Sequence, residues 1–185
     1  MSHKTWRTIE MELTRRSIAK AIREIEDCQR QLTEAMNALI RKLAEEGAQV
    51  ARMQVVGFDA VDSGDLEHSI YGYFDPASRI GYVIAGSAHA FYVEYGTGII
   101  GAIEPHPEAA EAGWEYMVGD HITIGPGGHI GWWYKKGSSD IFSSPELGGD
   151  GEFRFTRGQP ARPFMYNTLV WLEEAAEALG REIFS

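Results

Sequence analysis

The sequence predicts an α+β fold: a long N-terminal helix, an antiparallel β-sheet with long loops, and a C-terminal amphipathic helix packed on the sheet. Three observations predict it. Apolar residues recur at helical spacing before residue 55, the pattern changes to alternation after Gly57, and helical spacing returns after Pro163. We expect one domain over residues 1–185, with the long helix in 1–55, the sheet in 56–157 and the last helix in 163–185.

The first helix carries a narrow apolar stripe. Its positions are separated alternately by four and three residues, with Gln29 in the one polar slot: Ile18, Ile22, Ile25, Leu32, Met36, Leu39 and Leu43. Thr14 with Ser17 is expected to begin this helix, and Gly47 to interrupt or end it. The stripe either packs on the sheet of its own chain or pairs with another subunit, so Ile22, Ile25, Leu32 and Leu39 are candidate subunit contacts.

The middle of the chain reads as strands and long loops. Alternating residues at 69–75, 79–87 and 90–95 predict three consecutive strands of an antiparallel meander, because the connections between them are short. Regular pattern fails in 97–128 and 137–151, which we expect to be extended loops. The segments "HIGWWYKK" and "GEFRFTR" predict further strands, and Pro163 stands where the last helix begins.

The charge argues against a nucleic-acid binder. The net charge is -10; residues 1–55 hold 10 basic and 8 acidic side chains, and residues 56–185 hold 7 and 19, which gives +2 and -12. Nucleic-acid binders normally show a basic surface instead. No apolar run reaches the roughly 20 residues of a membrane span, and the single cysteine, Cys28, fits a reducing compartment. We therefore expect a soluble intracellular product with no membrane partner.

No set of residues predicts an enzyme. The carboxylate pairs Asp62 with Asp65 and Glu104 with Glu108 are more typical of a solvated surface than of acid–base catalysis. The histidines lack the spacing of a metal site, and the glycine-rich stretches "YGTGIIGA" and "IGPGGHIG" lack the Gly-Lys-Ser/Thr end of a phosphate-binding loop. We expect no catalytic residue, cofactor or metal ion.

Aromatic residues gather in the loop-and-strand region. The most prominent are Trp114, Trp132, Trp133 and Tyr134. Such a density is found at protein interfaces and sugar-binding platforms, and also in covered cores. These four residues are therefore candidate partner contacts, and core packing is the alternative.

Three segments together resemble a known family. They are "VDSGDLEHSI" (61–70), "AHAFYVEYGTG" (88–98) and "QPARPFMYNTL" (159–169). In this order they are similar to the signature blocks of tailed-phage neck proteins of siphophages and prophages, described as head–tail joining, tail-completion or minor tail proteins. Ser63 stands where the family usually has threonine, and 99–155 is longer than the shortest family versions need.

The resemblance implies a non-enzymatic virion protein made in the host bacterial cytoplasm. It implies a ring, possibly of six subunits, between the portal connector and the tail tube, through which DNA passes without specific binding. The residues that it marks as structural are Asp62, Ser63, Gly64, Glu94, Gly96, Thr97, Gly98, Pro160, Pro163 and Phe164. Glu94 is expected to be a mid-strand charge facing solvent or a neighbouring subunit. The alternatives are a phage-derived hydrolase or carbohydrate-binding protein that uses the tryptophan-rich loops, and a cytoplasmic homodimer paired through 18–43.

Overall fold

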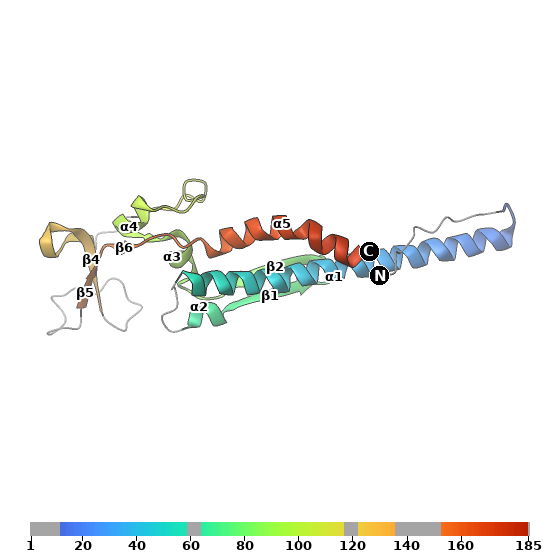
Figure 1. The fold of residues 1–185 in the computed structure, drawn as a ribbon, viewed down its shortest axis with the longest axis horizontal. Helices are drawn as coiled ribbons and strands as arrows, with labels where there is room; N and C mark the ends of the chain where they lie inside the picture. Colours follow the sequence, from blue (N-terminus) through green and yellow to red (C-terminus); the bar gives the residue numbers. More distant parts are fainter. Residues whose placement is uncertain (1–11, 59–63, 117–121, 136–152, 185) are drawn as a thin grey trace.

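The computed structural model describes residues 12–58, 64–116, 122–135 and 153–184, and confirms the α+β class (Figure 1). The elements follow in the order α1 (Arg15–Gly57), α2 (Asp65–His68), β1 (Ile70–Asp75), β2 (Ile80–Ala85), α3 (Ala90–Tyr95), α4 (Gly98–Ile103), β3 (Thr123–Ile124), the 3₁₀ helix η1 (Pro126–Gly128), β4 (Ile130–Lys135), β5 (Phe153–Thr156), β6 (Gly158–Gln159) and α5 (Phe164–Phe184). Helix α1 packs against both α5 and the β1–β2 hairpin, which form the main body with it (Figure 1).

Helix α1 is one uninterrupted rod of 43 residues, about 65 Å long at 1.5 Å per residue. It begins as predicted, because the Thr14 side chain accepts a hydrogen bond from the backbone N–H of Ser17. The expected end at Gly47 is wrong. A Cβ at Gly47 would lie 2.9 Å from Cγ2 of Val83 and 3.2 Å from Leu172, so the glycine permits close packing of β2 and α5 on the helix.

The predicted hairpin at 69–87 is confirmed as β1 and β2. They pair antiparallel from Ile70 opposite Ala85 to Asp75 opposite Ile80. Glycines on the inner face bring the hairpin against α1: a Cβ at Gly72 would overlap the carbonyl oxygen of Ala44. Arg52 of α1 also donates from Nη1 to the carbonyl oxygen of Ile70 at 2.7 Å.

The expected third strand, at 90–95, is wrong: these residues form helix α3. Ala90, Val93 and Glu94 share its inner face at helical spacing, whereas Phe91 is 67% exposed. Six residues with mixed polarity fit a period of 2 nearly as well as 3.6, so the alternation was misleading. The single meander is therefore replaced by two sheets, β1–β2 and β3–β4–β5.

The region 97–128 is more ordered than the sequence suggested. Helix α4, strand β3 and η1 lie within it, so the expectation of one irregular loop is wrong for its described part. The strands expected at "HIGWWYKK" and "GEFRFTR" are confirmed as β4 and β5, which pair antiparallel. The other expected loop, 137–151, lies outside the described residues.

Helix α5 begins directly after Pro163, as predicted, and packs antiparallel along α1. Gly180 lies beside Leu39, and Lys42 forms an ion pair with Glu182 at 2.8 Å. The core joins α1, α2, β1, α3 and α5 and consists of Ala48, Ala51, Val55, Leu66, Ile70, Ala90 and Phe164. Each of the three sequence blocks that carry the family resemblance contributes to it: Leu66 and Ile70 from the first, Ala90 from the second and Phe164 from the third.

Candidate functional site: the Glu94 corner and two uncovered apolar surfaces

Glu94 occupies the junction between α3 and α5. The residue is buried, with 7% of its surface exposed, so the expectation of a mid-strand charge facing solvent or a neighbour is wrong. Its Oε2 accepts from the backbone N–H of Met165 at 2.8 Å, and its Oε1 from the N–H of Tyr166 at 2.9 Å. A carboxylate at a helix N-terminus satisfies N–H groups that have no partner within the helix and interacts favourably with the helix dipole. Glu94 thus caps α5 from a position 71 residues earlier in the chain.

His106 is the second buried polar group of this corner, with 3% exposed. Its Nε2 lies 3.0 Å from Oε1 of Glu94, and its Nδ1 lies 3.0 Å from the backbone nitrogen of Glu108. A backbone N–H can only donate, so Nδ1 is the acceptor and Nε2 carries the proton that it donates to Glu94. The geometry assigns a neutral imidazole with its proton on Nε2.

Aromatic rings enclose the histidine. The Tyr95 ring lies 4.4 Å from the imidazole and stacks at 5.0 Å on Trp114, whose indole N–H donates to the carbonyl oxygen of Gly96. The Tyr116 hydroxyl accepts from the backbone N–H of His106 at 2.9 Å. Burial, together with the negative charges of neighbouring carboxylates, raises the pKa of Tyr95 above its usual 10.0.

The glycine pair that follows α3 shapes the corner. Gly96 and Gly98 have φ of +76° and +63°, values that side-chain-bearing residues rarely adopt. Between them Thr97 pairs antiparallel with Gln159, and a Cβ at Gly96 would lie 2.6 Å from the backbone nitrogen of Ala161. The segment 96–98 is therefore held against the chain that leads into α5.

The other residues marked by the resemblance fall around this junction. Pro160 and Pro163 belong to the segment between β6 and α5, and Phe164 is fully buried in the core. Gly64, with φ of +83°, precedes α2 in a left-handed conformation. Asp62 and Ser63 lie outside the described residues.

Sequence reasoning missed the capping role of Glu94 and the position of His106. One signal was present: Arg162 and Pro163, directly before α5, have no side-chain oxygen to accept from the first N–H groups of the helix. That deficiency implies an acceptor from elsewhere in the chain. The sequence does not indicate which of the many carboxylates supplies it.

The hydrogen bonds and the burial of Glu94 and His106 fit a structural role for the corner. Three donors already surround the two Glu94 oxygens, and Glu94 and His106 are closed off from solvent. A general base needs access to a substrate proton, which this carboxylate lacks. Glu104 and Glu108, weighed as a pair from the sequence, are both exposed. Within the described residues no three His, Cys, Asp or Glu side chains gather as metal ligands would.

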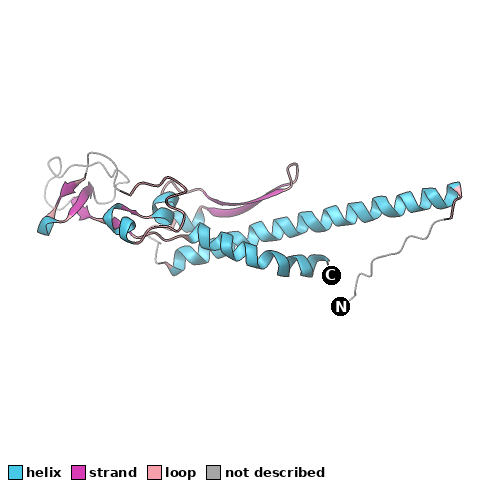
Figure 2. Ribbon diagram, turned by 90° about the horizontal axis from the view of Figure 1, so that it is seen from above, coloured by secondary structure: helices cyan, strands magenta, loops and turns pink. Residues whose placement is uncertain are grey.

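The N-terminal half of α1 carries the first apolar surface, a stripe that no other described helix or strand covers, although Ala21 beside it is buried. Helix α5 ends beside the middle of α1, so the N-terminal part of α1 projects beyond it (Figure 2). We call the stretch from Arg15 to Met36 the overhang. Its stripe is exposed: 39% for Ile18, 50% for Ile22, 56% for Ile25, 50% for Leu32 and 48% for Met36. Leu39, the next position, is only partly exposed because it lies beside α5. The stripe is thus continuous with a packed helix–helix seam.

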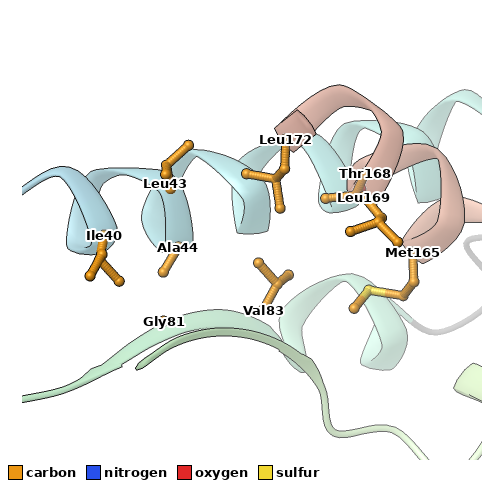
Figure 3. Close-up of a pocket in the computed structure, with 9 residues that line it drawn as sticks. All are labelled: Ile40, Leu43, Ala44, Gly81, Val83, Met165, Thr168, Leu169 and Leu172. Carbon is orange, nitrogen blue, oxygen red and sulfur yellow. The ribbon is translucent and has the colours of Figure 1, made fainter. Parts of the chain in front are cut away.

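The second uncovered surface is an apolar groove of about 340 Å³ between β2 and α5, with α1 as its floor (Figure 3). It is lined by Ile40, Leu43, Ala44, Gly81, Val83, Met165, Thr168, Leu169 and Leu172. Val83 and Leu172 point into it from opposite sides, and Leu169 is 51% exposed. The Thr168 hydroxyl donates to the carbonyl oxygen of Phe164, so the groove offers an occupant almost purely apolar contact.

The tryptophan-rich region does not form one exposed platform in the described residues. Trp114 belongs to the corner, and Trp132 lies close to the Cα of Gly98, so a Cβ there would be 2.6 Å from its ring. The Trp133 ring contacts Phe155 edge to face at 5.4 Å, and Tyr134, like both β4 tryptophans, is partly buried. Partner contact by these residues stays a prediction.

Comparison of the chain with family models, with curated proteins and with solved structures found no match. Among the described helices, none combines the length and the apolar character needed to cross a bilayer. The structural features above, together with the resemblance in sequence, are therefore the basis for a functional proposal.

Proposed function

We propose that the chain is a non-enzymatic structural protein of a phage or prophage virion that joins head to tail or completes the tail. In this role it assembles into a ring between the portal connector and the tail tube. The observation that carries the proposal is the pair of uncovered apolar surfaces, the overhang and the groove. Contiguous exposed apolar side chains on a folded chain are typical of a surface where another protein binds.

The positions of the resembling segments support the same proposal. All three blocks contribute to one core, and the second and third are joined directly by Glu94 and by a hydrogen bond from the Arg162 N–H to the carbonyl oxygen of Val93. Residues that meet in this way are constrained together by the fold. The three resembling segments are thus explained physically, because their residues contact one another in one part of the fold.

The carbohydrate-binding alternative receives no such support. A sugar platform needs flat aromatic faces open to solvent, and the rings of Trp114 and Trp133 are packed against Tyr95 and Phe155. Titration with oligosaccharides is expected to leave tryptophan fluorescence unchanged.

Deletion of the gene from the phage or prophage that encodes the chain tests the proposal. We expect filled heads and separate tails in electron micrographs of the lysate, and joined particles when the wild-type gene is supplied on a plasmid. Antibodies against the chain should label the neck or tail of these particles. Joined particles in the deletion lysate would contradict the proposal. A deletion lysate in which neither heads nor tails form would contradict it as well.

A further inference from the structure

The buried imidazole of His106 holds a turn that proline residues have left short of donors. Pro105 and Pro107 stand on either side of the histidine. Because Pro107 has no N–H, the first N–H after the histidine belongs to Glu108. Within the described residues this N–H donates to Nδ1 of His106 at 3.0 Å and to no backbone carbonyl. The bond spans two residues, as the side-chain bond of an Asx-turn does.

Further turns follow directly from this bond. The N–H of Ala109 donates to the carbonyl oxygen of His106 at 3.1 Å, and the N–H of Ala112 to that of Glu108 at 2.9 Å. Ala109 is buried, whereas Glu108 and Glu111 on the same turns are exposed. The bond to Nδ1 therefore fixes the entry into the acidic part of the loop.

Titratable groups from three parts of the chain surround the imidazole. The ring of Tyr95 lies 4.4 Å and the ring of Tyr166 5.5 Å from it, and the Tyr116 hydroxyl accepts from the backbone N–H of His106. Within the described residues, the only hydrogen bond at Nδ1 comes from the N–H of Glu108. The full set of groups is Glu94 and Tyr95 on α3, Tyr166 on α5, and Glu108 and Tyr116 in the loop.

We propose that His106 is a proton-sensitive switch, in which a second proton on the imidazole opens the 106–108 turn while the bond to Glu94 stays. The proton comes from solvent and binds Nδ1, because Nε2 already carries one. Two N–H groups would then face each other across 3.0 Å, so the N–H of Glu108 must move away. Nε2 keeps both its proton and its acceptor, and the imidazolium faces a carboxylate.

The switch acts on the loop and leaves the helix start in place. Met165 and Tyr166 keep their bonds to Glu94, because neither bond involves the imidazole. The acidic turns that begin at Glu108 lose the bond that fixes their entry. Histidine ordinarily changes its charge between about pH 5 and about pH 8, so a mild change of pH is the trigger. The proposal does not rest on the proposed function.

NMR on the full chain tests the switch. We follow the ring nitrogens of His106 and the backbone amide of Glu108 from about pH 8 down to about pH 4.5. The Glu108 amide should shift in step with protonation of Nδ1, while the amides of Met165 and Tyr166 keep their positions. The exposed His89 is an internal control, because its titration should leave the Glu108 amide unchanged.

Two variants separate the two ring nitrogens. In His106→Asn the side-chain oxygen can accept from the N–H of Glu108 as in an Asx-turn, and it does not titrate. In His106→Gln the NH₂ can still donate to Glu94, but the N–H of Glu108 has no acceptor, as in the protonated wild type. At about pH 7 the Glu108 amide should exchange about tenfold faster in His106→Gln than in the wild type, and at a similar rate to the wild type in His106→Asn. Circular dichroism checks that both variants fold.

Four outcomes would overturn the proposal. The first is an imidazole that takes the second proton while the Glu108 amide keeps its position. The second is an imidazole that stays neutral until the whole chain unfolds. The third is a shift of the Met165 and Tyr166 amides together with that of Glu108, because the whole corner would then open. The fourth is equal exchange at Glu108 in the two variants, which would remove the role assigned to Nδ1.

Discussion

Replacement of Glu94 by glutamine changes one atom in a buried carboxylate that accepts three hydrogen bonds. Glutamine offers one oxygen and one NH₂ in place of two carboxylate oxygens. If its oxygen takes the position of Oε1, it keeps the bonds from Tyr166 and His106, but its NH₂ faces the N–H of Met165. If it is reversed, its NH₂ faces two donors. The better orientation therefore leaves the partly buried N–H of Met165 without an acceptor.

The cost follows from that count. A buried donor that loses its partner costs about 1–3 kcal/mol, and loss of the charge at the helix N-terminus adds to it. We expect Glu94→Gln to lower the free energy of unfolding by about 2–3 kcal/mol, and Glu94→Ala, which leaves three donors unpaired, by about 3–5 kcal/mol. A domain of this kind has about 5–15 kcal/mol in total, so the alanine variant approaches the limit of stability.

Urea unfolding followed by circular dichroism measures these values. Glu104→Gln makes the same chemical change at an exposed site and should stay within about 0.5 kcal/mol of the wild type. The reasoning is refuted if Glu94→Gln is no less stable than Glu104→Gln. A loss in glutamine as large as that in alanine would show that the charge alone, and not the count of acceptors, sets the stability.

Three further predictions concern backbone contacts and one titrating ring. Gly72→Ala should lower the free energy of unfolding by about 2 kcal/mol or more, because the new Cβ overlaps Ala44 and pushes the hairpin off α1. The control Gly57→Ala, whose Cβ meets nothing within 4 Å, should be neutral or slightly stabilising. The urea midpoints of the two variants test this difference. Gly158→Ala should destabilise at least as much, since its φ is +98° and its Cβ overlaps the paired chain; an unchanged midpoint would contradict this. The raised pKa of Tyr95 favours the neutral phenol in the folded state, so its contribution is complete below pH 10 and is lost as the pH rises through the folded-state pKa. Tyr95→Phe should therefore lose less stability than the wild type between pH 9 and 11; equal losses would count against the shift.

Features set by neighbouring residues could be predicted from the sequence. The start of α1 depends on the Thr14 hydroxyl, which accepts a hydrogen bond from the N–H of Ser17 only three residues later. The hairpin depends on two segments of alternating residues with a short connection. Pro163 marks the start of α5 for an equally local reason, the fixed φ of proline. In each of these cases the decisive contact lies within a few residues.

Features set by distant contacts could not be predicted. Gly47 reads as a helix end because glycine is a poor helix former, yet Val83 and Leu172 require a residue without a side chain there. Residues 90–95 read as a strand because the segment is too short to show its period, and its helical form depends on α5 and His106 being in place around Glu94. Tertiary packing decided both.

The corner also fixes the segment that leads from β6 into α5. The Glu94→Gln variant can therefore be tested at the start of α5 as well as by its global stability. The chain passes from β6 through the segment before α5, and Glu94 fixes the first turn of that helix while Arg162 donates to the carbonyl oxygen of Val93. Loss of one acceptor should free the amide of Met165 and fray this turn before the rest of α5 or the β1–β2 hairpin opens. In hydrogen exchange we expect the amides of Met165 and Tyr166 to exchange faster in Glu94→Gln than in the wild type. The hairpin amides of Tyr71 to Phe74 should accelerate only as far as the loss of global stability requires. Equal acceleration in both places would mean that the carboxylate stabilises the whole fold without a special role at the helix start.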